Sequence, residues 1–355
     1  MPTWPLIPRR SPSLALALQG GGAHGAFTWG VLDALLEHGP MPITAISGTS
    51  AGAMNAVVLA QGLLDGGRDG ARAALARYWD AVGSQPAFEW LTQGEGEHTT
   101  LTPAARWWMR WSQQLSPYQR LGQDANPLRE ILAAQVDFAR LRQQRDVRLF
   151  IAATQANSGR LRLFTTGELS IDAVLASACL PTLQKAVLID GEPYWDGGFS
   201  ANPAVSPLIH DSGASDLLLV MLSPWAYGAL PTTAAEIQLR AMDIGFNAAF
   251  LREMRALAEN SARAGRQWWR AGSDARLARL NWHVVDGHDA LASLSGDSRL
   301  IAHRRFLEHL RDAGRARTVA WLAEHGSALG RRSSADLGAL FGSDAPPPGL
   351  RPLTA

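Results

Sequence analysis

Two short apolar runs, each followed at once by a turn rich in small residues and then by a helix-like stretch, constrain the fold of this chain most strongly. The first run covers Leu14–Leu18 and precedes a glycine loop at residues 19–25. The second covers residues 43–47 and leads into Gly48-Thr49-Ser50-Ala51-Gly52. Apolar runs that alternate with helix-like stretches are typical of α/β sheet proteins. We therefore expect a chain built around a sheet with helices packed on it.

The remaining sequence continues this alternation. Helices are expected at about residues 26–38, 50–63, 69–82 and 170–178, and strands at about 147–154, 160–164, 187–190, 193–195, 216–222 and 280–285. Asn202-Pro203 predicts the N-cap and first residue of another helix. We expect a core over residues 12–225 with a tryptophan-rich insertion at about 86–121, a mostly helical C-terminal extension over 226–325 packed on the core, and a loosely ordered tail over 326–355.

Composition excludes several classes of function. The formal net charge of +1 gives no reason to expect nucleic acid as a partner. Cys179 is the only cysteine, and no ligand pattern for zinc or calcium is present, so neither a disulfide nor a metal or other cofactor is expected. The apolar run after Arg9-Arg10 is about 5 residues, shorter than a secretion signal. No run approaches the roughly 18 residues of a membrane span. These features predict a cytoplasmic protein, at most peripheral to a membrane; its oligomeric state stays open.

The glycine loop admits three interpretations. Gly20, Gly22 and Gly25 satisfy Gly-x-Gly-x-x-Gly after a strand, which is the pattern of a dinucleotide site. That fold needs an acidic residue near the end of the second strand, where this chain has Ile46-Ser47-Gly48. A tight turn without a ligand is the second interpretation. The third is an oxyanion hole, because glycines let backbone N–H groups approach a developing negative charge closely.

The pentapeptide around Ser50 matches Gly-x-Ser-x-Gly, which holds a serine on a sharp strand-to-helix turn. The alternative is an ordinary helix N-cap serine. A nucleophilic serine needs a neighbour that accepts its proton. His283 and His288 follow it in the order of the α/β-hydrolases, but those enzymes place the serine after several strands rather than after the second.

A carboxylate is the better candidate for this base. Asp196 ends a predicted hairpin strand and is followed by Gly197 and Gly198. Two glycines allow the backbone to turn sharply and leave the carboxylate uncrowded at the strand end. The hairpin itself is predicted by the turn at Asp190-Gly191. We therefore expect Asp196, rather than a histidine, beside Ser50.

In combination these motifs resemble the patatin-like phospholipase family. The matching stretches are Gly20–Gly25, Gly48–Gly52, Ala176–Pro181, Asp196–Gly198 and Asn202-Pro203, within roughly residues 14–210. The resemblance implies a three-layer α/β/α fold with a mainly parallel central sheet. It also implies a Ser–Asp dyad without histidine or metal. Ser50 would be the nucleophile and Asp196 the base.

The resemblance further assigns supporting roles around this dyad. The oxyanion hole would consist of backbone N–H groups of Gly20, Gly21, Gly22, Ala23 and Ala51. The residues that support the motifs would be His24, Gly25, Gly48, Gly52, Gly197 and Gly198. Many family members carry arginine or lysine where this chain has His24. We therefore expect less fixed positive charge here, and activity that titrates near the usual histidine pKa of about 6.5.

The tryptophan-rich insertion suggests where lipid would bind. Trp107, Trp108 and Trp111 share one helical face with arginines opposite, which suits a bilayer interface or a lid, although such a stripe is more often core. The sequence thus predicts a serine hydrolase of acyl lipids that makes transient contact with membrane surfaces. The alternatives are a carboxylesterase for soluble esters and a binding or scaffolding protein whose dyad is idle.

Overall fold

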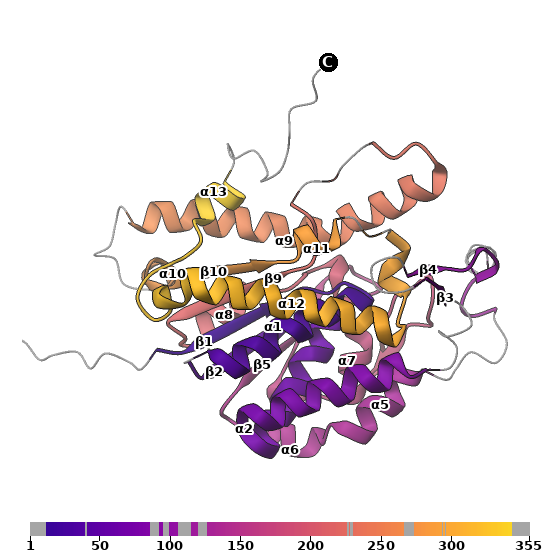
Figure 1. Cartoon of the computed structure of the whole chain (residues 1–355), viewed down its shortest axis with the longest axis horizontal. Helices are drawn as coiled ribbons and strands as arrows, with labels where there is room; N and C mark the ends of the chain where they lie inside the picture. Colours follow the sequence, from indigo (N-terminus) through magenta and orange to yellow (C-terminus); the bar gives the residue numbers. More distant parts are fainter. Residues whose placement is uncertain are drawn as a thin grey trace, which may run out of the picture.

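A computed structural model describes residues 12–342 except 40, 86–91, 95–98, 106–114, 120–125, 226, 228–229, 266–272, 293 and 295. Its centre is an eight-stranded sheet in the order β10-β9-β1-β2-β5-β8-β7, with β6 also paired to β5 (Figure 1). The expected interfacial residues Trp107, Trp108 and Trp111 lie outside the described residues. Outside the central sheet, β3 (Thr92–Gln93) and β4 (Thr100–Leu101) pair antiparallel with each other.

Most of the central sheet is parallel, as expected. The parallel strands are β1 (Leu14–Leu18), β2 (Ile43–Gly48), β5 (Arg148–Gln155), β9 (Asp216–Met221) and β10 (Asn281–Asp286). The remaining strands form antiparallel pairs: β6 (Leu161–Thr165) and β8 (Glu192–Asp196) each pair antiparallel with β5, and β7 (Val187–Ile189) pairs antiparallel with β8. The C-terminal part of the chain contributes β10 to this sheet, so it is joined to the core by backbone pairing as well as by packing.

The sequence of β1 explains the three layers. Leu14, Leu16 and Leu18 point to one face of the sheet and Ala15 and Ala17 to the other, because side chains alternate along a strand. The leucine face is covered by α1 (Gly25–His38), α2 (Ala51–Gly83), α7 (Ile171–Ser177) and α12 (Arg304–His325). The alanine face is covered by α8 (Ser206–Asp211), α9 (Ala234–Gly265), α10 (Ser273–Arg279) and α13 (Leu337–Phe341). This arrangement is the α/β/α fold that the sequence predicts.

Short helices complete the described part of the chain. They are α5 (Pro127–Gln135), α6 (Phe138–Gln143) and α11 (His288–Leu291), with 3-10 turns η1 (Gly22–His24), η3 (Thr166–Glu168), η4 (Gly197–Phe199), η5 (Gly296–Leu300) and η6 (Gly326–Ala328). The two helices expected at 50–63 and 69–82 meet in α2 at a kink, where Gly66 and Gly67 have non-helical backbone angles. No helix in the described ranges has both the length and the apolar character to cross a membrane.

Strand β5 brings two distant parts of the chain end to end. Its first half pairs in parallel with β2, over Arg148–Ile151, and its last residues pair antiparallel with β8, from Ala153. The other edge of β5 is occupied by β6. Strands β2 and β8 therefore lie along the same edge and point toward each other, so that their final residues meet. The contact is direct: a Cβ built on Gly197 would lie 3.0 Å from Cγ2 of Thr49.

Two sequence-based expectations are wrong. Asn202-Pro203 does not begin a helix; α8 begins at Ser206, and the Asn202 side chain accepts a hydrogen bond from Gly20 N–H instead. The expected loose tail is also wrong for residues 326–342. Ser333 and Ser334 bond to β10, and the side chains of α13 are packed against α9. Polar and small residues favoured a loop there, but tertiary contacts order it.

Candidate active site

Ser50 lies on a strained turn between β2 and α2. Its backbone angles, φ 54° and ψ −121°, fall in a region that side chains other than glycine rarely adopt. The turn is compact because a Cβ at Gly52 would lie 2.2 Å from the carbonyl oxygen of Leu18 in β1. Only glycine fits there, and the serine is consequently held at the N-terminus of α2. Partial positive charge at that end of a helix favours an anion nearby.

Asp196, the last residue of β8, meets Ser50 at this turn. Its side chain is 1% exposed, accepts a hydrogen bond from Gly198 N–H (2.8 Å) and interacts with the Ser50 hydroxyl. Burial raises the pKa of Asp196 to about 7, against the lowering effect of these two hydrogen bonds. A carboxyl group with a pKa near neutrality is suited to accept a proton from a neighbouring hydroxyl.

The glycine loop lies over the same turn. A Cβ at Gly20 would come within 2.8 Å of the Ser50 Cβ, and one at Gly22, where φ is +59°, within 2.3 Å of the Arg299 carbonyl oxygen. Gly21 and Gly22 stand at the start of η1, and Ala51 is the first residue of α2. Backbone N–H groups at such positions have no partner within the helix. In the described part of the chain, no acceptor for these three groups is found.

Gly20 differs from its neighbours, which corrects its expected place in the oxyanion hole. Its N–H donates to Asn202 Oδ1 at 2.7 Å, so it is not free to bind an oxyanion. Similarly, the backbone N–H of Ser50 donates to Ser177 Oγ at 2.9 Å. Asn202 and Ser177 are both buried. These two side chains therefore tie the glycine loop and the turn to the segments on either side of Asp196.

The expectation that His24 titrates near pH 6.5 is wrong. Its ring is buried, and Nε2 hydrogen-bonds with Ser298 Oγ in η5 at 2.7 Å. Desolvation, together with the positive charge of Arg299, lowers the pKa of His24 to about 3. The ring is thus neutral at physiological pH and anchors the glycine loop to η5. The cation near this loop is Arg299, which forms an ion pair with Asp243 of α9.

One of the histidines considered as alternative bases, His283, has other partners. His283 Nε2 pairs with Asp216 Oδ1 at 2.9 Å, and His283 Nδ1 lies 2.8 Å from Ser334 Oγ. Asp216 is the first residue of β9, whereas Ser50 follows the last residue of the parallel strand β2. The His283–Asp216 pair therefore joins β10 to β9 and the segment after α12, away from Ser50.

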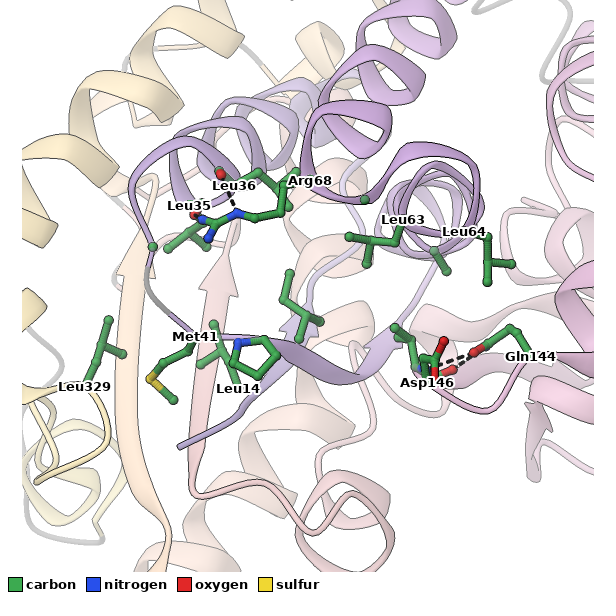
Figure 2. Close-up of a pocket in the computed structure, with 16 residues that line it drawn as sticks. Leu14, Leu35, Leu36, Met41, Leu63, Leu64, Arg68, Gln144, Asp146 and Leu329 are labelled. Carbon is green, nitrogen blue, oxygen red and sulfur yellow. Dashed lines mark hydrogen bonds between the residues drawn. The ribbon is translucent and has the colours of Figure 1, made fainter. Parts of the chain in front are cut away.

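A cavity of about 420 Å³ lies at the opposite edge of the sheet (Figure 2). Leu14, Ile43 and Val147, at or just before the beginnings of β1, β2 and β5, line it together with Leu35 and Leu36 of α1. Ser50 comes just after the C-terminal end of β2, and Asp196 is the last residue of β8, which meets that end. Both residues are therefore at the opposite end of the parallel strands from the cavity. The cavity consequently does not belong to the candidate active site. In the ranges that the structure describes, no three His, Cys, Asp or Glu side chains gather where they could hold a metal ion.

The fold and this site define an α/β protein in which a serine on a strand-to-helix turn meets a buried carboxylate. The sequence model of one family, Patatin-like phospholipase, matches residues 16–209. The chain therefore belongs to the patatin-like phospholipase family, whose members are lipid acyl hydrolases. The matched residues include both Ser50 and Asp196. A comparison with curated proteins finds no match.

The solved structures that this chain is similar to include VipD and ExoU. VipD from Legionella pneumophila is 16% identical, with a TM-score of 0.42 over 89% of this chain and 67% of that chain. The type III effector protein ExoU is 15% identical, with a TM-score of 0.30 over 87% of this chain, which spans 54% of that chain. ExoU in its complex with SpcU, from the type III secretion system of Pseudomonas aeruginosa, is 17% identical, with a TM-score of 0.31, and 88% of this chain and 75% of that chain are covered.

Three supporting residues were not identified as such from the sequence. Ser177 lies within a motif that was recognised, but its bond to the Ser50 N–H depends on where α7 ends in space. Asn202 was recognised, but as the N-cap of a helix and not as the acceptor of the Gly20 N–H. Arg299 carries no sequence signal, because η5 lies far from every motif along the chain. Its position against Gly22 comes from tertiary packing alone.

Proposed function

We propose that the protein hydrolyses carboxylic esters of phospholipids or related acyl lipids, with Ser50 as nucleophile and Asp196 as base. The observation that carries this proposal is the meeting of the strained Ser50 turn with a buried Asp196 whose pKa is raised to about 7. Family membership supports the lipid substrate class. Without the Ser50 hydroxyl beside it, a buried carboxyl group at this position would have no evident role.

In the first half of the reaction, Asp196 accepts the Ser50 proton as Oγ attacks the ester carbonyl. The carbonyl oxygen becomes an oxyanion, held by the free N–H groups of Gly21 and Gly22 and by Ala51 N–H. Ala23 N–H, the next along η1, completes the proposed set. The carbon–oxygen bond to the alcohol then breaks, and Asp196 gives its proton to the departing oxygen. The products are an acyl group on Ser50 and a free alcohol.

In the second half, water releases the acyl group. Asp196 accepts a proton from water, whose oxygen attacks the acyl carbon, and the proton returns to Ser50 Oγ as that bond breaks. The free fatty acid leaves, and Ser50 and Asp196 regain their first state. Because Asp196 must be ionised to begin each half, kcat/KM should rise with pH through about 7 and level off above it. His24, with a pKa of about 3, contributes no step near neutrality.

The first test is labelling with a fluorophosphonate probe, followed by mass spectrometry to locate the adduct. We expect an adduct on Ser50 in the wild type, its absence in Ser50→Ala, and a rate at least tenfold lower in Asp196→Asn. The matched control is Asp190→Asn, which changes the exposed aspartate of the neighbouring Asp-Gly turn. A folded protein that does not label on Ser50 would support the idle, binding-protein alternative.

The second test separates lipid from soluble substrates. Hydrolysis of phospholipid vesicles is compared with hydrolysis of a short-chain p-nitrophenyl ester by the same preparation. Release of fatty acid from vesicles, lost in Ser50→Ala, is the expected result. Ester hydrolysis without any release from vesicles or micelles would favour the soluble carboxylesterase.

A further inference from the structure

A second serine meets a histidine and an aspartate at the other end of the parallel strands from Ser50. Asp216 is the first residue of β9, His283 lies on the neighbouring strand β10, and Ser334 lies between α12 and α13. The Nε2 atom of His283 lies 2.9 Å from Asp216 Oδ1, and its Nδ1 atom lies 2.8 Å from Ser334 Oγ. A serine within hydrogen-bond reach of a histidine that a third group orients is the arrangement of an activated nucleophile.

The charge on Asp216 determines which nitrogen of His283 carries a proton. Burial raises the pKa of Asp216, but hydrogen bonds from His283, Ser215 and Gly330 outweigh this effect and hold the pKa below its usual value. An ionised carboxylate can only accept hydrogen bonds, so His283 Nε2 is the donor in its pair with Oδ1. In the neutral ring Nδ1 then has a lone pair, and the Ser334 hydroxyl donates to it. The serine proton therefore points at a base.

The histidine ring is fixed in this orientation by its surroundings. The side chains of His283 and Asp216 are both fully buried. Trp321 of α12 packs against the ring, with 5.7 Å between the ring centroids and 81° between the ring planes. Asp216 in turn accepts hydrogen bonds from Ser215 Oγ at 2.6 Å and from Gly330 N–H at 2.8 Å. Because both neighbours of the ring are held in place, its Nδ1 atom keeps its direction toward the serine.

Ser334 is the member of this cluster that solvent can reach. The residue is partly exposed, whereas the histidine and the aspartate are buried. Its backbone is held against β10, because the N–H groups of Ser334 and Ala335 both donate to the Trp282 carbonyl oxygen at 3.0 Å. These two N–H groups are consequently not available to bind an oxyanion. The cluster thus supplies a base for the serine, but these groups do not supply the oxyanion donors that an efficient hydrolase needs.

We propose that Ser334 is a second activated serine, which takes an acyl group from an ester with a good leaving group and retains it. The site is independent of the hydrolysis proposed for Ser50. As Ser334 Oγ attacks the ester carbonyl carbon, its proton moves to His283 Nδ1, and the Asp216 carboxylate stabilises the imidazolium. The bond from the carbonyl carbon to the leaving oxygen then breaks, and the proton passes from Nδ1 to that oxygen.

The products of this step are an acyl ester of Ser334 and a free alcohol or phenol. Hydrolysis of the acyl-serine would require stabilisation of a second oxyanion. The N–H groups of Ser334 and Ala335 remain bonded to Trp282, so water releases the acyl group slowly. Each chain is therefore modified once, and the acylated form accumulates instead of turning over.

The test is reaction of the full chain with p-nitrophenyl acetate, followed by release of p-nitrophenol and by tandem mass spectrometry of the digested protein. All proteins carry Ser50→Ala, so that the first site does not contribute. We expect a burst that approaches one equivalent of p-nitrophenol, and an acetyl group on Ser334 that is absent in Ser334→Ala. The matched control is Ser333→Ala, which changes the adjacent exposed serine, whose Oγ accepts a hydrogen bond from Trp282 N–H. Ser334 should be acetylated in this control within twofold of the parent rate.

Asp216 acts as a positioning residue, and Asp216→Asn tests this role. The substitution keeps the size of the side chain and removes the negative charge that stabilises protonated His283. Acetylation of Ser334 should therefore slow at least tenfold. The urea midpoint and the circular dichroism spectrum of the variant show whether it is folded. A merely structural role for Asp216 would change the urea midpoint and leave the acetylation rate of the folded protein unchanged.

A comparison within a single sample requires no variant of the cluster. Ser334 should be acetylated at least tenfold faster than the adjacent exposed Ser333. Equal rates at these two serines, no acetyl group on Ser334 in folded protein, or an unchanged rate in folded Asp216→Asn would each overturn the proposal. Acetylation of Ser334, with no labelling of Ser50 by fluorophosphonate in the wild type, would support the second site and refute the proposed hydrolysis.

Discussion

Replacement of Asp196 by asparagine should abolish most activity and yet stabilise the fold at neutral and alkaline pH. Burial raises the pKa of this carboxyl group from 3.8 to about 7 in the folded protein. Between these values the folded protein holds a proton that the unfolded chain has released. The free energy of unfolding therefore falls as the pH rises through this window. Each pH unit lowers it by about 1.4 kcal/mol, so the full effect above pH 7 is about 4 kcal/mol.

Asparagine has nearly the same shape and no charge to desolvate. Its Oδ1 can still accept the hydrogen bond from Gly198 N–H that Asp196 accepts in the wild type. The difference in unfolding free energy, variant minus wild type, should thus be near zero at pH 4 and increase to a plateau above pH 7. The plateau should be about 4 kcal/mol, because the pKa of about 7 already includes the lowering effect of the hydrogen bonds that the carboxylate accepts.

The assay is urea unfolding, followed by tryptophan fluorescence and circular dichroism, at pH 4.5, 6 and 8. Asp190→Asn is the control, because Asp190 is exposed and its substitution should give only a small difference. Ester hydrolysis is measured on the same samples. A difference for Asp196→Asn that is constant across this pH range would refute the raised pKa, and with it the stated reason that Asp196 can act as a base near neutrality.

Four further substitutions test other parts of the site. Ser50→Ala should lower kcat at least about 10³-fold on any ester while leaving the urea midpoint nearly unchanged. Gly52→Ala should destabilise the protein by about 3 kcal/mol, since its Cβ would meet the Leu18 carbonyl oxygen at 2.2 Å, whereas Gly167→Ala, with no atom within 4 Å, should change stability by less than about 1 kcal/mol. Asn202→Ala removes the acceptor of Gly20 N–H and should lower kcat about tenfold with little change in KM; an effect on KM alone would contradict a role in positioning the loop. His24→Gln should leave the shape of the pH–rate profile between pH 5 and 9 unchanged, because the pKa of His24 lies near 3; a shifted profile would show that the ring titrates after all.

Local pattern was sufficient to predict the elements that carry the site. The apolar run before the glycine loop identifies β1, and the apolar run that ends in the Gly-x-Ser-x-Gly turn identifies β2. The hairpin of β7 and β8 follows from its Asp-Gly turn. Each of these signals depends on neighbours within a few residues, such as side-chain alternation, backbone angles that only small residues tolerate, and helix starts. Such signals can be recognised in the sequence because they involve residues that are close together along the chain.

Predictions from local pattern were wrong for polar side chains whose partners lie far away along the chain. Asn202 before a proline is a good N-cap by its neighbours, yet in the fold it bonds to Gly20, which lies 182 residues away. His24 has an ordinary sequence context, but burial beside Ser298 and Arg299 lowers its pKa to about 3. The segments that pack against a side chain determine its hydrogen-bond partner and its local dielectric. The residues next to it in the sequence do not reveal which segments those are.

The sequence by itself determined which residues are candidates for the chemistry: a serine on a strand-to-helix turn, a glycine loop and an aspartate at a strand end. Only the tertiary structure decided that they meet. Strand β8 pairs with the end of β5 in line with β2, and this pairing places Asp196 beside Ser50. Burial at this junction then raises the pKa of Asp196 to about 7. The reason is physical: turn and strand preferences act between neighbours, whereas pairing, desolvation and exposed surface arise from contacts between segments far apart in the chain.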